Sequence, residues 1–275
     1  MRRHGPVPTA AGLGLHGHGC WIYADDLEFR AGALAFLKDG ITLGQRLLYV
    51  RSGTVDKLRR DLDGLPDVER LLTAGRLRIM PLETAYAIGE PVDPVAQLTM
   101  FSTATSAALV DGYTGLRVVA DVTQLVLDEE LWAAHTHWES VADRYISKNP
   151  LAGLCCYDRR VLPDQIVGDL ACVHRSSNGP PSLAPFRLFA GREGMSLAGE
   201  VDSFSADALR RLLTAATPPS GDVVLELDEL EFIEHRGVLA IEDHARTLAR
   251  EGRAIEFRGA PPTFDRITEL LDVAL

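Results

Sequence analysis

Residues 221–252 read GDVVLELDELEFIEHRGVLAIEDHARTLAREG and contain a strand pattern, an acidic turn and a helix pattern, in that order. The apolar run from Val223 to Leu227 predicts a short buried strand. After the turn at 232–237, apolar residues recur at helical spacing from Val238 to Ala249, which predicts an amphipathic helix. The first turn of such a helix exposes free backbone N–H groups, so α/β domains often contact ligands or partners there. We therefore expect an α/β domain whose functional surface lies in this turn.

The sequence on both sides of this stretch continues the same pattern. From residue 186 onward the predicted order is ββαβαβα. Strands at 186–190 and 195–201 are joined by a hairpin turn, and a helix capped by Ser205 follows. The strand and helix described above come next, followed by a strand at 254–257 and a helix at 263–273. Residues 186–275 therefore form one small α/β domain in this interpretation.

This domain resembles the STAS family, named for sulfate transporters and anti-sigma factor antagonists. Residues 197–202, LAGEVD, are similar to the family's L-x-G-E-I/L-D. At the turn, family members read I/L-D-S-S/T-G-L, and an anti-sigma-factor kinase phosphorylates the first hydroxyl residue. Here Glu234 replaces the Asp, His235 and Arg236 replace both hydroxyl residues, and Gly237 is kept. The resemblance implies that these four residues contact a protein partner, an anti-sigma factor or a related regulator, without control by serine phosphorylation.

The first half of the chain alternates predicted strands and helices over a longer span. Strands at 18–23, 46–50, 77–82, 116–120 and 151–157 are separated by helical patterns. This alternation predicts βαβ units with right-handed crossovers and a mainly parallel sheet flanked by helices. The segment 177–185 is rich in Pro, Ser and Gly and has no apolar pattern, so we predict a linker between a domain at 1–176 and one at 186–275.

Three motifs in the first half resemble the MEDS family, the methanogen/methylotroph, DcmR sensory domain. Gly17, His18, Cys20 and Tyr23 follow the family's G-D-H-x-C-x-x-Y, with Gly17 immediately before His18 where the family often has Asp. Residues 115–118, GLRV, and 155–158, CCYD, match the other two motifs. The resemblance spans roughly residues 14–176. It implies a RecA-like α/β sheet that serves as a ligand sensor.

The candidate ligand-binding residues lie in these motifs or near the predicted strand ends, where open α/β sheets usually bind ligands. They are His18, Cys20, Tyr23, Arg117, Glu139, Tyr157 and Asp158. We favour a ligand pocket with no metal and no cofactor. The alternative is a soft metal site, because His16, His18 and Cys20 alternate along a strand and share one face, where Cys155, Cys156 or His174 could join them. Two other histidines, His135 and His137, are two positions apart on a helix, so they fall on different faces and are interpreted as structural.

Composition and missing motifs exclude several classes of function. The net charge is -11, with -7 in residues 186–275 and -4 in the remainder, so we predict no direct nucleic-acid binding. No apolar run approaches the roughly 20 residues of a membrane span, and the N-terminus lacks a signal-peptide core. Four cysteines are few for this length, which favours a cytoplasmic protein with reduced thiols. The strand-to-helix turn at 50–57 lacks G-x-x-x-x-G-K-[ST], so we predict no ATP hydrolysis, and no catalytic residues are assigned.

Together these features predict a cytoplasmic bacterial signalling protein that is not an enzyme. In this hypothesis a MEDS-like sensor binds an unidentified small molecule, and a STAS-like domain docks on an anti-sigma factor or similar partner to regulate transcription indirectly. Two alternatives are a nucleotide- or metal-dependent RecA-like enzyme with an appended STAS domain, and a scaffold that senses nothing. Sheet edges that can pair make a homodimer a further possibility.

Overall fold

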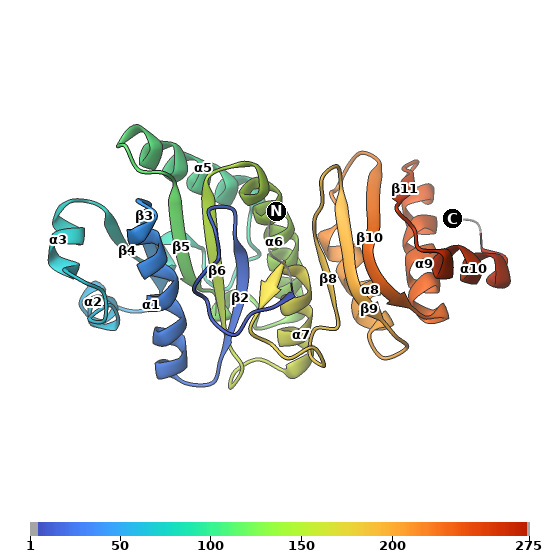
Figure 1. The fold of residues 1–275 in the computed structure, drawn as a ribbon, viewed down its shortest axis with the longest axis horizontal. Coiled ribbons are helices and arrows are strands. Elements are labelled where there is room, and N and C mark those ends of the chain that lie inside the picture. The colour runs from blue at the N-terminus through green and yellow to red at the C-terminus, as the bar shows by residue number, and fades with distance from the viewer. Residues whose placement is uncertain (1–4, 274–275) are drawn as a thin grey trace.

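The computed structural model describes residues 5–273, which form two sheets with helices packed against them (Figure 1). The larger sheet is entirely parallel, with strand order β1-β7-β2-β6-β5-β3-β4. The smaller sheet has the order β11-β10-β9-β8, and its β8–β9 pair is antiparallel. The α/β fold class, with a mainly parallel sheet followed by a smaller ββαβαβα domain, is confirmed. The first four and last two residues of the predicted domain ranges lie outside the described part.

The larger sheet region contains β1 (Gly5–Pro6), β2 (His18–Tyr23), α1 (Asp26–Thr42), β3 (Arg46–Arg51), α2 (Val55–Asp61), α3 (Val68–Thr73), β4 (Leu77–Pro81), α4 (Leu82–Ala85), α5 (Pro94–Val110), β5 (Leu116–Asp121), the 3-10 turn η1 (Thr123–Leu125), α6 (Glu129–Lys148), β6 (Leu151–Asp158), α7 (Asp164–Val173) and β7 (Ser176–Ser177). The smaller sheet region contains β8 (Phe186–Ala190), β9 (Met195–Val201), α8 (Ala206–Ala216), β10 (Val223–Ile233), α9 (His235–Arg250), β11 (Ile255–Arg258) and α10 (Pro262–Leu271). The break between the sheets therefore falls within the predicted linker.

Aspartate caps fix where the long helices of the larger domain begin. The Asp25 carboxylate accepts hydrogen bonds from the backbone N–H groups of Leu27 and Glu28, each at 2.8 Å, at the start of α1. Asp93 and Asp128 cap α5 and α6 in the same way. Each cap satisfies N–H groups that the helix itself leaves without a partner, which stabilises the first turn. The caps thereby set the register of α6, which carries much of the candidate site.

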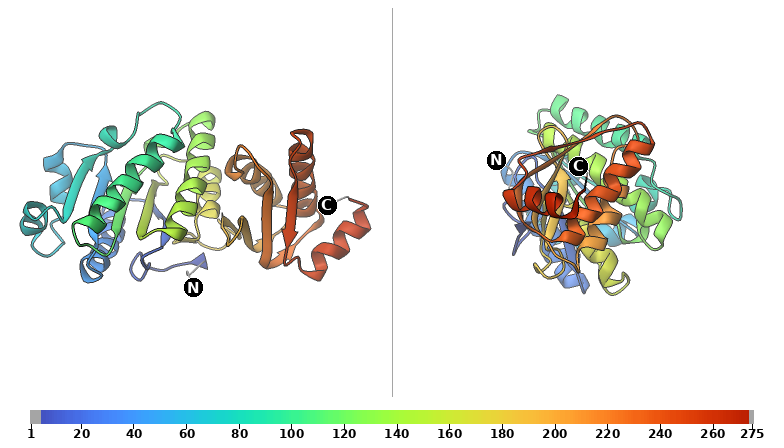
Figure 2. Two further views of the ribbon diagram at one scale, coloured as in Figure 1. Left: turned by 90° about the horizontal axis from the view of Figure 1, so that it is seen from above. Right: turned by 90° about the vertical axis from the view of Figure 1, so that its right-hand side faces the viewer.

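Two apolar clusters lie on opposite faces of the larger sheet. One packs α1, α2 and α3 against it and includes Phe29 and Phe36. The other packs α5, α6 and α7 on the opposite face and includes Phe101, Trp138 and Leu170. This second cluster continues without a break into the smaller domain. Helices α6 and α7 lie between the two sheets (Figures 1 and 2), against β8 and α8.

Polar contacts reinforce the apolar interface between the domains. The Ser140 hydroxyl on α6 donates to the Ala216 carbonyl oxygen at 2.9 Å. The Arg211 guanidinium on α8 donates two hydrogen bonds to the Asp169 carboxylate on α7, both at 3.0 Å. The linker is also held in place, because the Asn178 side chain exchanges two 2.7 Å hydrogen bonds with the backbone of Ile22. The two domains therefore pack directly against each other and are not joined only by a flexible linker.

The largest error in a predicted boundary concerns β10, and the ends predicted for the other strands and for the last helix differ by at most two residues. The strand expected to end at 227 continues to Ile233 and pairs with β9 as far as Val201. Register shifts between Glu226 and Glu229, and again after Leu230, let this acidic segment remain in the strand. The turn before α9 consequently shortens to Glu234. Within residues 5–273, no helix combines the length and the apolar content needed to cross a membrane.

Candidate functional site

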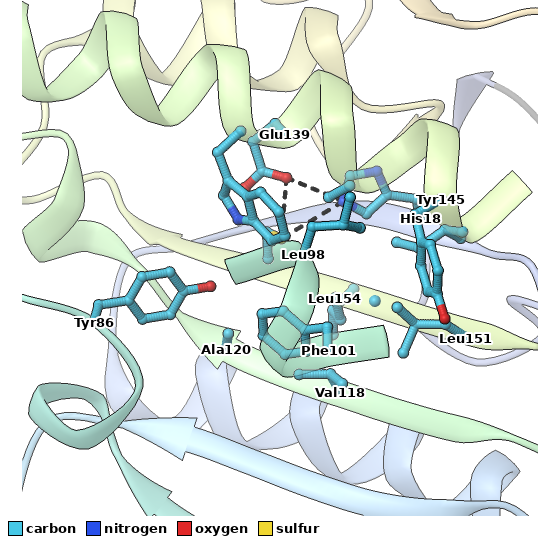
Figure 3. A pocket seen from close by; sticks show the side chains of 15 residues that line it. His18, Tyr86, Leu98, Phe101, Val118, Ala120, Glu139, Tyr145, Leu151 and Leu154 are labelled. Atoms are coloured by element: carbon cyan, nitrogen blue, oxygen red, sulfur yellow. Dashed lines mark hydrogen bonds and ion pairs between the residues drawn. The ribbon is translucent and has the colours of Figure 1, made fainter. Parts of the chain in front are cut away.

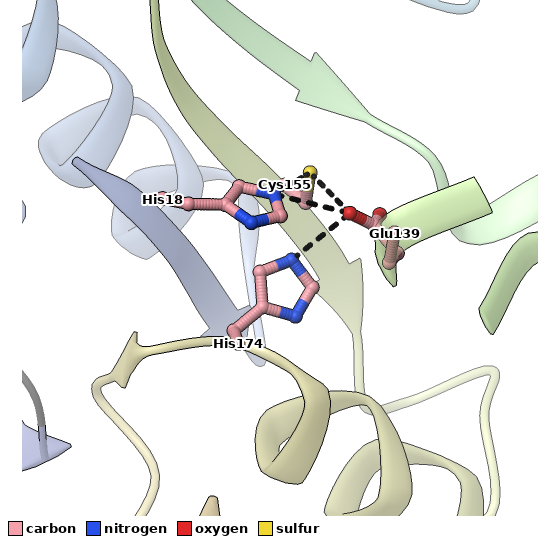
Figure 4. Close-up of side chains that lie close together, drawn as sticks. All are labelled: His18, Glu139, Cys155 and His174. Atoms are coloured by element: carbon pink, nitrogen blue, oxygen red, sulfur yellow. Dashed lines mark hydrogen bonds and ion pairs between the residues drawn. The ribbon is translucent and has the colours of Figure 1, made fainter. Parts of the chain in front are cut away.

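Four side chains from four different elements meet between the larger sheet and α6 (Figure 4): His18 on β2, Glu139 on α6, Cys155 on β6 and His174 at the end of α7. We call them the four-residue cluster. Their donor atoms all lie within 4.8 Å of one another. The Glu139 Oε2 atom is central, at 3.1 Å from His18 Nε2, 3.3 Å from His174 Nε2 and 3.5 Å from Cys155 Sγ. His18, Glu139 and His174 are buried, and Cys155 is partly buried.

Strand pairing brings His18 and Cys155 together. Strands β2 and β6 are neighbours in the sheet, and the register places His18 opposite Gly153. A Cβ atom at Gly153 would lie 3.3 Å from the His18 ring, so glycine leaves room for the imidazole there. Cys155 Sγ is 3.7 Å from His18 Nε2 as a result.

The outward-facing atoms of the cluster are held by a second layer of contacts. His18 Nδ1 lies 3.2 Å from Asp143 Oδ1, and His174 Nδ1 donates to the Leu170 carbonyl oxygen at 2.7 Å. Glu139 Oε1 accepts a 2.9 Å hydrogen bond from the Tyr157 hydroxyl and lies 2.8 Å from His135 Nε2. His135, Glu139 and Asp143 are spaced by four residues on α6, so they share one face of the helix.

Burial and mutual charge determine the protonation of the cluster. Burial alone would lower the pKa of His18, but Asp143 and Glu139 outweigh it and raise that pKa to about 9. Burial opposes ionisation of Glu139, yet His174 and His135 hold its pKa well below the usual value. Burial, reinforced by the charge of Glu139, raises the pKa of the Cys155 thiol well above its usual value. At neutral pH the protein alone thus presents a carboxylate, an imidazolium and a thiol.

An apolar cavity of about 40 Å³ opens beside the cluster (Figure 3). His18, Glu139 and Cys155 form its polar end. The rest of the wall is apolar or aromatic and comes mainly from α5, β5, α6 and β6: Leu98, Phe101, Val118, Ala120, Trp138, Ala142, Tyr145, Ile146, Leu151 and Leu154, with Tyr86 and Gly153. One water needs roughly 10–15 Å³ by this measure, so the cavity accepts a molecule of only a few non-hydrogen atoms unless it widens.

The structure brings three of the predicted ligand-binding residues, His18, Glu139 and Tyr157, into one contact network. Cys20 is buried on the same face of β2, but it lines neither the cavity nor the four-residue cluster. His16 is not part of this network, because its Nδ1 contacts the carbonyl oxygens at the end of α6.

Tyr23 and Asp158 lie elsewhere, at the carboxyl ends of their strands. The Tyr23 hydroxyl donates to Asp121 Oδ2 at 2.8 Å, and Asp158 pairs with Arg160. Arg51 pairs with Asp121 and two further aspartates at this edge. The edge where we expected a ligand is therefore occupied by ion pairs, and the cavity lies on the face of the sheet.

Arg117 lies on the opposite face of the sheet from the cavity, beneath α1. Its guanidinium donates to Gln45 Oε1 at 2.6 Å and to the carbonyl oxygens of Phe36 and Leu13 at 3.1 and 2.7 Å. Burial lowers the pKa of Arg117 to about 10. The position and the hydrogen bonds give Arg117 the role of fixing α1 to the sheet.

Sequence reasoning missed two contributors to the network, His135 and Asp143. The expectation that His135 and His137 fall on different faces is confirmed: His135 is fully buried beside Glu139, while His137 Nδ1 contacts the Ala215 carbonyl oxygen at 3.2 Å. The available signal was the spacing of four between His135, Glu139 and Asp143, which puts three titratable groups on one apolar helix face.

The predicted partner-contacting turn is exposed at its tip and tightly packed at its base. His235 and Arg236 are exposed, and Glu234 accepts a hydrogen bond from the Ser203 hydroxyl. Gly237 is buried, and a Cβ atom there would lie 2.7 Å from carbons of both Val201 and Ile233. Only glycine lets α9 approach the sheet this closely. Next to Ser203, the Phe204 side chain is 94% exposed.

Comparison with known families agrees with this division of the chain. Residues 17–175 match the model of MEDS, the methanogen/methylotroph, DcmR sensory domain. Residues 190–274 match a model described as the Mlab, STAS domain. A search of curated proteins finds none that matches the chain. Because the first match covers more than half of the sequence and the second follows it directly on the smaller sheet, the chain belongs to the MEDS family and carries a STAS domain after its sensory domain.

Proposed function

We propose that this protein is a cytoplasmic, non-enzymatic signalling protein. Its MEDS domain binds a small molecule in the cavity beside the four-residue cluster, and its STAS domain docks on an anti-sigma factor or a related regulator of transcription. Binding in the cavity changes the docking surface through α6. Serine phosphorylation has no part in this control, because His235 and Arg236 occupy the two hydroxyl positions.

The cavity wall indicates which ligands fit. Apolar side chains favour an uncharged molecule with few carbon atoms, while the carboxylate and imidazole at one end favour a single hydroxyl, carbonyl or amine group. A ligand that hydrogen-bonds to His18 or Glu139 replaces part of their contact with each other. The cost of leaving such buried groups unpaired gives the site its selectivity.

The observation that carries the proposal is the double contact of Asp143. Its Oδ1 atom lies 3.2 Å from His18 Nδ1 in the sensor domain, and its Oδ2 atom accepts a 2.8 Å hydrogen bond from the Ala190 backbone N–H at the end of β8. Asp143 is fully buried, so neither the ion-pair contact with His18 nor the hydrogen bond from Ala190 exchanges freely with water. One carboxylate thus joins the polar end of the cavity to the STAS sheet, and a shift of His18 is transmitted to β8.

The docking surface combines an exposed aromatic side chain with the charged turn. Phe204 and Phe232 are 94% and 44% exposed, and Ser203, adjacent to Phe204, donates to Glu234 at the start of α9. An aromatic anchor beside exposed His235 and Arg236 is the composition found at the centres of protein interfaces. A partner that presents an apolar pocket rimmed by carboxylates is complementary to it.

Binding and docking are tested on the full chain. We expect short alcohols, from methanol to butanol, to raise the melting temperature of the wild type and to shift side-chain NMR signals around the cavity. Ala142→Leu fills the cavity and abolishes both effects, whereas Ala134→Leu on the same helix, away from the cavity, preserves them.

In parallel, immobilised protein is presented to a panel of purified anti-sigma factors with and without alcohol. We expect at least one to bind, and Phe204→Ser to weaken that interaction. Absence of binding to every member of the panel contradicts the docking half, and no response to any alcohol contradicts the sensing half.

A further inference from the structure

We propose that His18, Glu139, Cys155 and His174 bind one divalent transition-metal ion of the zinc class. This inference departs from the favoured sequence interpretation, a pocket without a metal, and takes up the metal alternative with Glu139 in place of His16 and Cys20. It concerns an ion and not the molecule in the cavity, and although the two share His18 and Glu139, the metal experiments below need no ligand in the cavity.

The spacing of the four donor atoms matches a tetrahedral zinc site. Zinc binds nitrogen and oxygen at about 2.0–2.1 Å and sulfur at about 2.3 Å, so neighbouring donors in a tetrahedron are about 3.3 Å apart, or about 3.6 Å when one is sulfur. Glu139 Oε2 lies 3.1 Å and 3.3 Å from the two histidine Nε2 atoms. Cys155 Sγ lies 3.5 Å from that oxygen and 3.7 Å from His18 Nε2. These four of the six donor–donor distances agree with the tetrahedral values to within about 0.2 Å, and all six are at most 4.8 Å.

The orientation of His174 favours a cation between its ring and Glu139. Its Nδ1 donates to the Leu170 carbonyl oxygen, so in the neutral imidazole Nε2 carries a lone pair. That lone pair points at Glu139 Oε2, 3.3 Å away and itself an acceptor (Figure 4). Within residues 5–273, His174 Nε2 makes no hydrogen bond although the residue is fully buried. An ion placed between the two acceptors satisfies both of them.

Charge also balances in the buried site. A divalent ion bound by the Glu139 carboxylate, the Cys155 thiolate and two neutral imidazoles gives a net charge of zero, which avoids burying an uncompensated charge. Binding requires the His18 imidazolium and the Cys155 thiol each to release one proton to solvent, since metal ligands must be deprotonated.

The second layer of contacts is the one that metal-binding histidines generally have. His18 contacts the Asp143 carboxylate through Nδ1, and His174 contacts a backbone carbonyl oxygen through Nδ1, which leaves both Nε2 atoms directed inward. Such contacts fix the ring tautomer and strengthen metal binding, and their removal lowers affinity by about 10- to 100-fold. Three of the four donors also line the cavity, so the ion lies at its polar end.

The first experiment measures metal in the wild-type full chain. Protein purified without chelator is analysed by elemental mass spectrometry, and we expect about one zinc ion per chain. After the ion is removed, titration with Co²⁺ is expected to give the intense visible bands of tetrahedral cobalt and a near-ultraviolet thiolate-to-cobalt charge-transfer band. Protein that holds no metal as purified and gives no such spectrum at stoichiometric Co²⁺ overturns the proposal.

Variants then identify the donors. Cys155→Ser is expected to lose the charge-transfer band, while the adjacent control Cys156→Ser keeps it. Asp143→Asn is expected to keep the band but to lower Co²⁺ affinity about 10- to 100-fold. Circular dichroism confirms that each variant is folded. A band that survives in folded Cys155→Ser protein, or disappears only in Cys156→Ser, contradicts the assignment.

Discussion

The ion pair between Arg211 and Asp169 gives a quantitative test of the interface between the two domains. Asp169 is 2% exposed, and both of its hydrogen bonds from Arg211 measure 3.0 Å. Burial raises the pKa of Asp169, although Arg211 opposes the shift. Arg211→Ala therefore leaves a buried carboxylate without its cation. Because the raised pKa means that the folded state favours the protonated acid, the damage grows as pH rises through that pKa.

The expected magnitude follows from the burial of each partner. Breaking a fully buried ion pair costs about 3–5 kcal/mol. The Arg211 side chain retains 34% exposure, so water screens part of the interaction, and we expect Arg211→Ala to lower the free energy of unfolding by about 2 kcal/mol. Asp169→Asn in that background removes the stranded charge and restores about 1 kcal/mol. Urea unfolding at pH 7.5, followed by tryptophan fluorescence and circular dichroism, measures both values.

A neighbouring residue provides the matched control. Arg210, next along α8, pairs with two exposed aspartates, so Arg210→Ala is expected to cost no more than about 0.5 kcal/mol. A double-mutant cycle on Arg211 and Asp169 should give a coupling energy above about 1 kcal/mol. Coupling near zero, or equal losses for Arg210→Ala and Arg211→Ala, would refute the reasoning that burial makes this pair strong.

Three further predictions concern the STAS domain. Burial lowers the pKa of His244, so the stability that its neutral imidazole contributes is complete above pH about 6.5 and is lost as pH falls through the lower folded-state pKa. Urea unfolding between pH 5 and 7.5 should show this loss of stability, and His244→Asn should make the loss smaller. Gly237→Ala places a methyl group 2.7 Å from carbons of β9 and β10 and should lower the free energy of unfolding by about 1–3 kcal/mol. An unchanged midpoint of urea unfolding would contradict the close packing of α9. Phe204→Ser removes an exposed side chain and should change the free energy of unfolding by less than about 0.5 kcal/mol. The same variant should weaken partner binding at least about tenfold, as measured by surface plasmon resonance. A loss of stability without a loss of binding would assign Phe204 a structural role.

The order of elements was predictable from the sequence because most buried strands are apolar runs and several long helices begin at a capping residue. The side chains of Asp25, Asp93 and Asp128 cap α1, α5 and α6 in the structure. The prediction that Ser205 caps α8 is wrong, because its hydroxyl donates to the Asp202 carboxylate and makes no cap hydrogen bond, and α9 also begins without a side-chain cap. The end of β10 was not predictable, since Asp228 and Glu229 look like a turn. They remain in the strand because shifts in its pairing with β9 accommodate them, and such shifts depend on the neighbouring strand.

The candidate site was predictable only in part. The resemblance to MEDS pointed to His18 and Tyr157, which do meet at Glu139. It equally pointed to Arg117, which lies in the GLRV motif at 115–118 but whose side chain leaves the sheet on the other face. Alternation along a strand tells which residues share a face, but it cannot tell which face the cavity occupies, because that depends on how α1 and α6 pack.

The apolar cluster that runs from the sensory domain into the STAS domain has a consequence for domain exchange. All five residues of β8 are buried although it is an edge strand of its sheet, because α6 and α7 cover it. A chimera that joins residues 186–275 to a different sensor would leave this edge open to aggregation unless the new sensor supplied equivalent helices. The contact between the domains therefore restricts which sensor domains can replace the present one. A chimera that keeps the STAS domain must also keep the face of α6 that contacts β8.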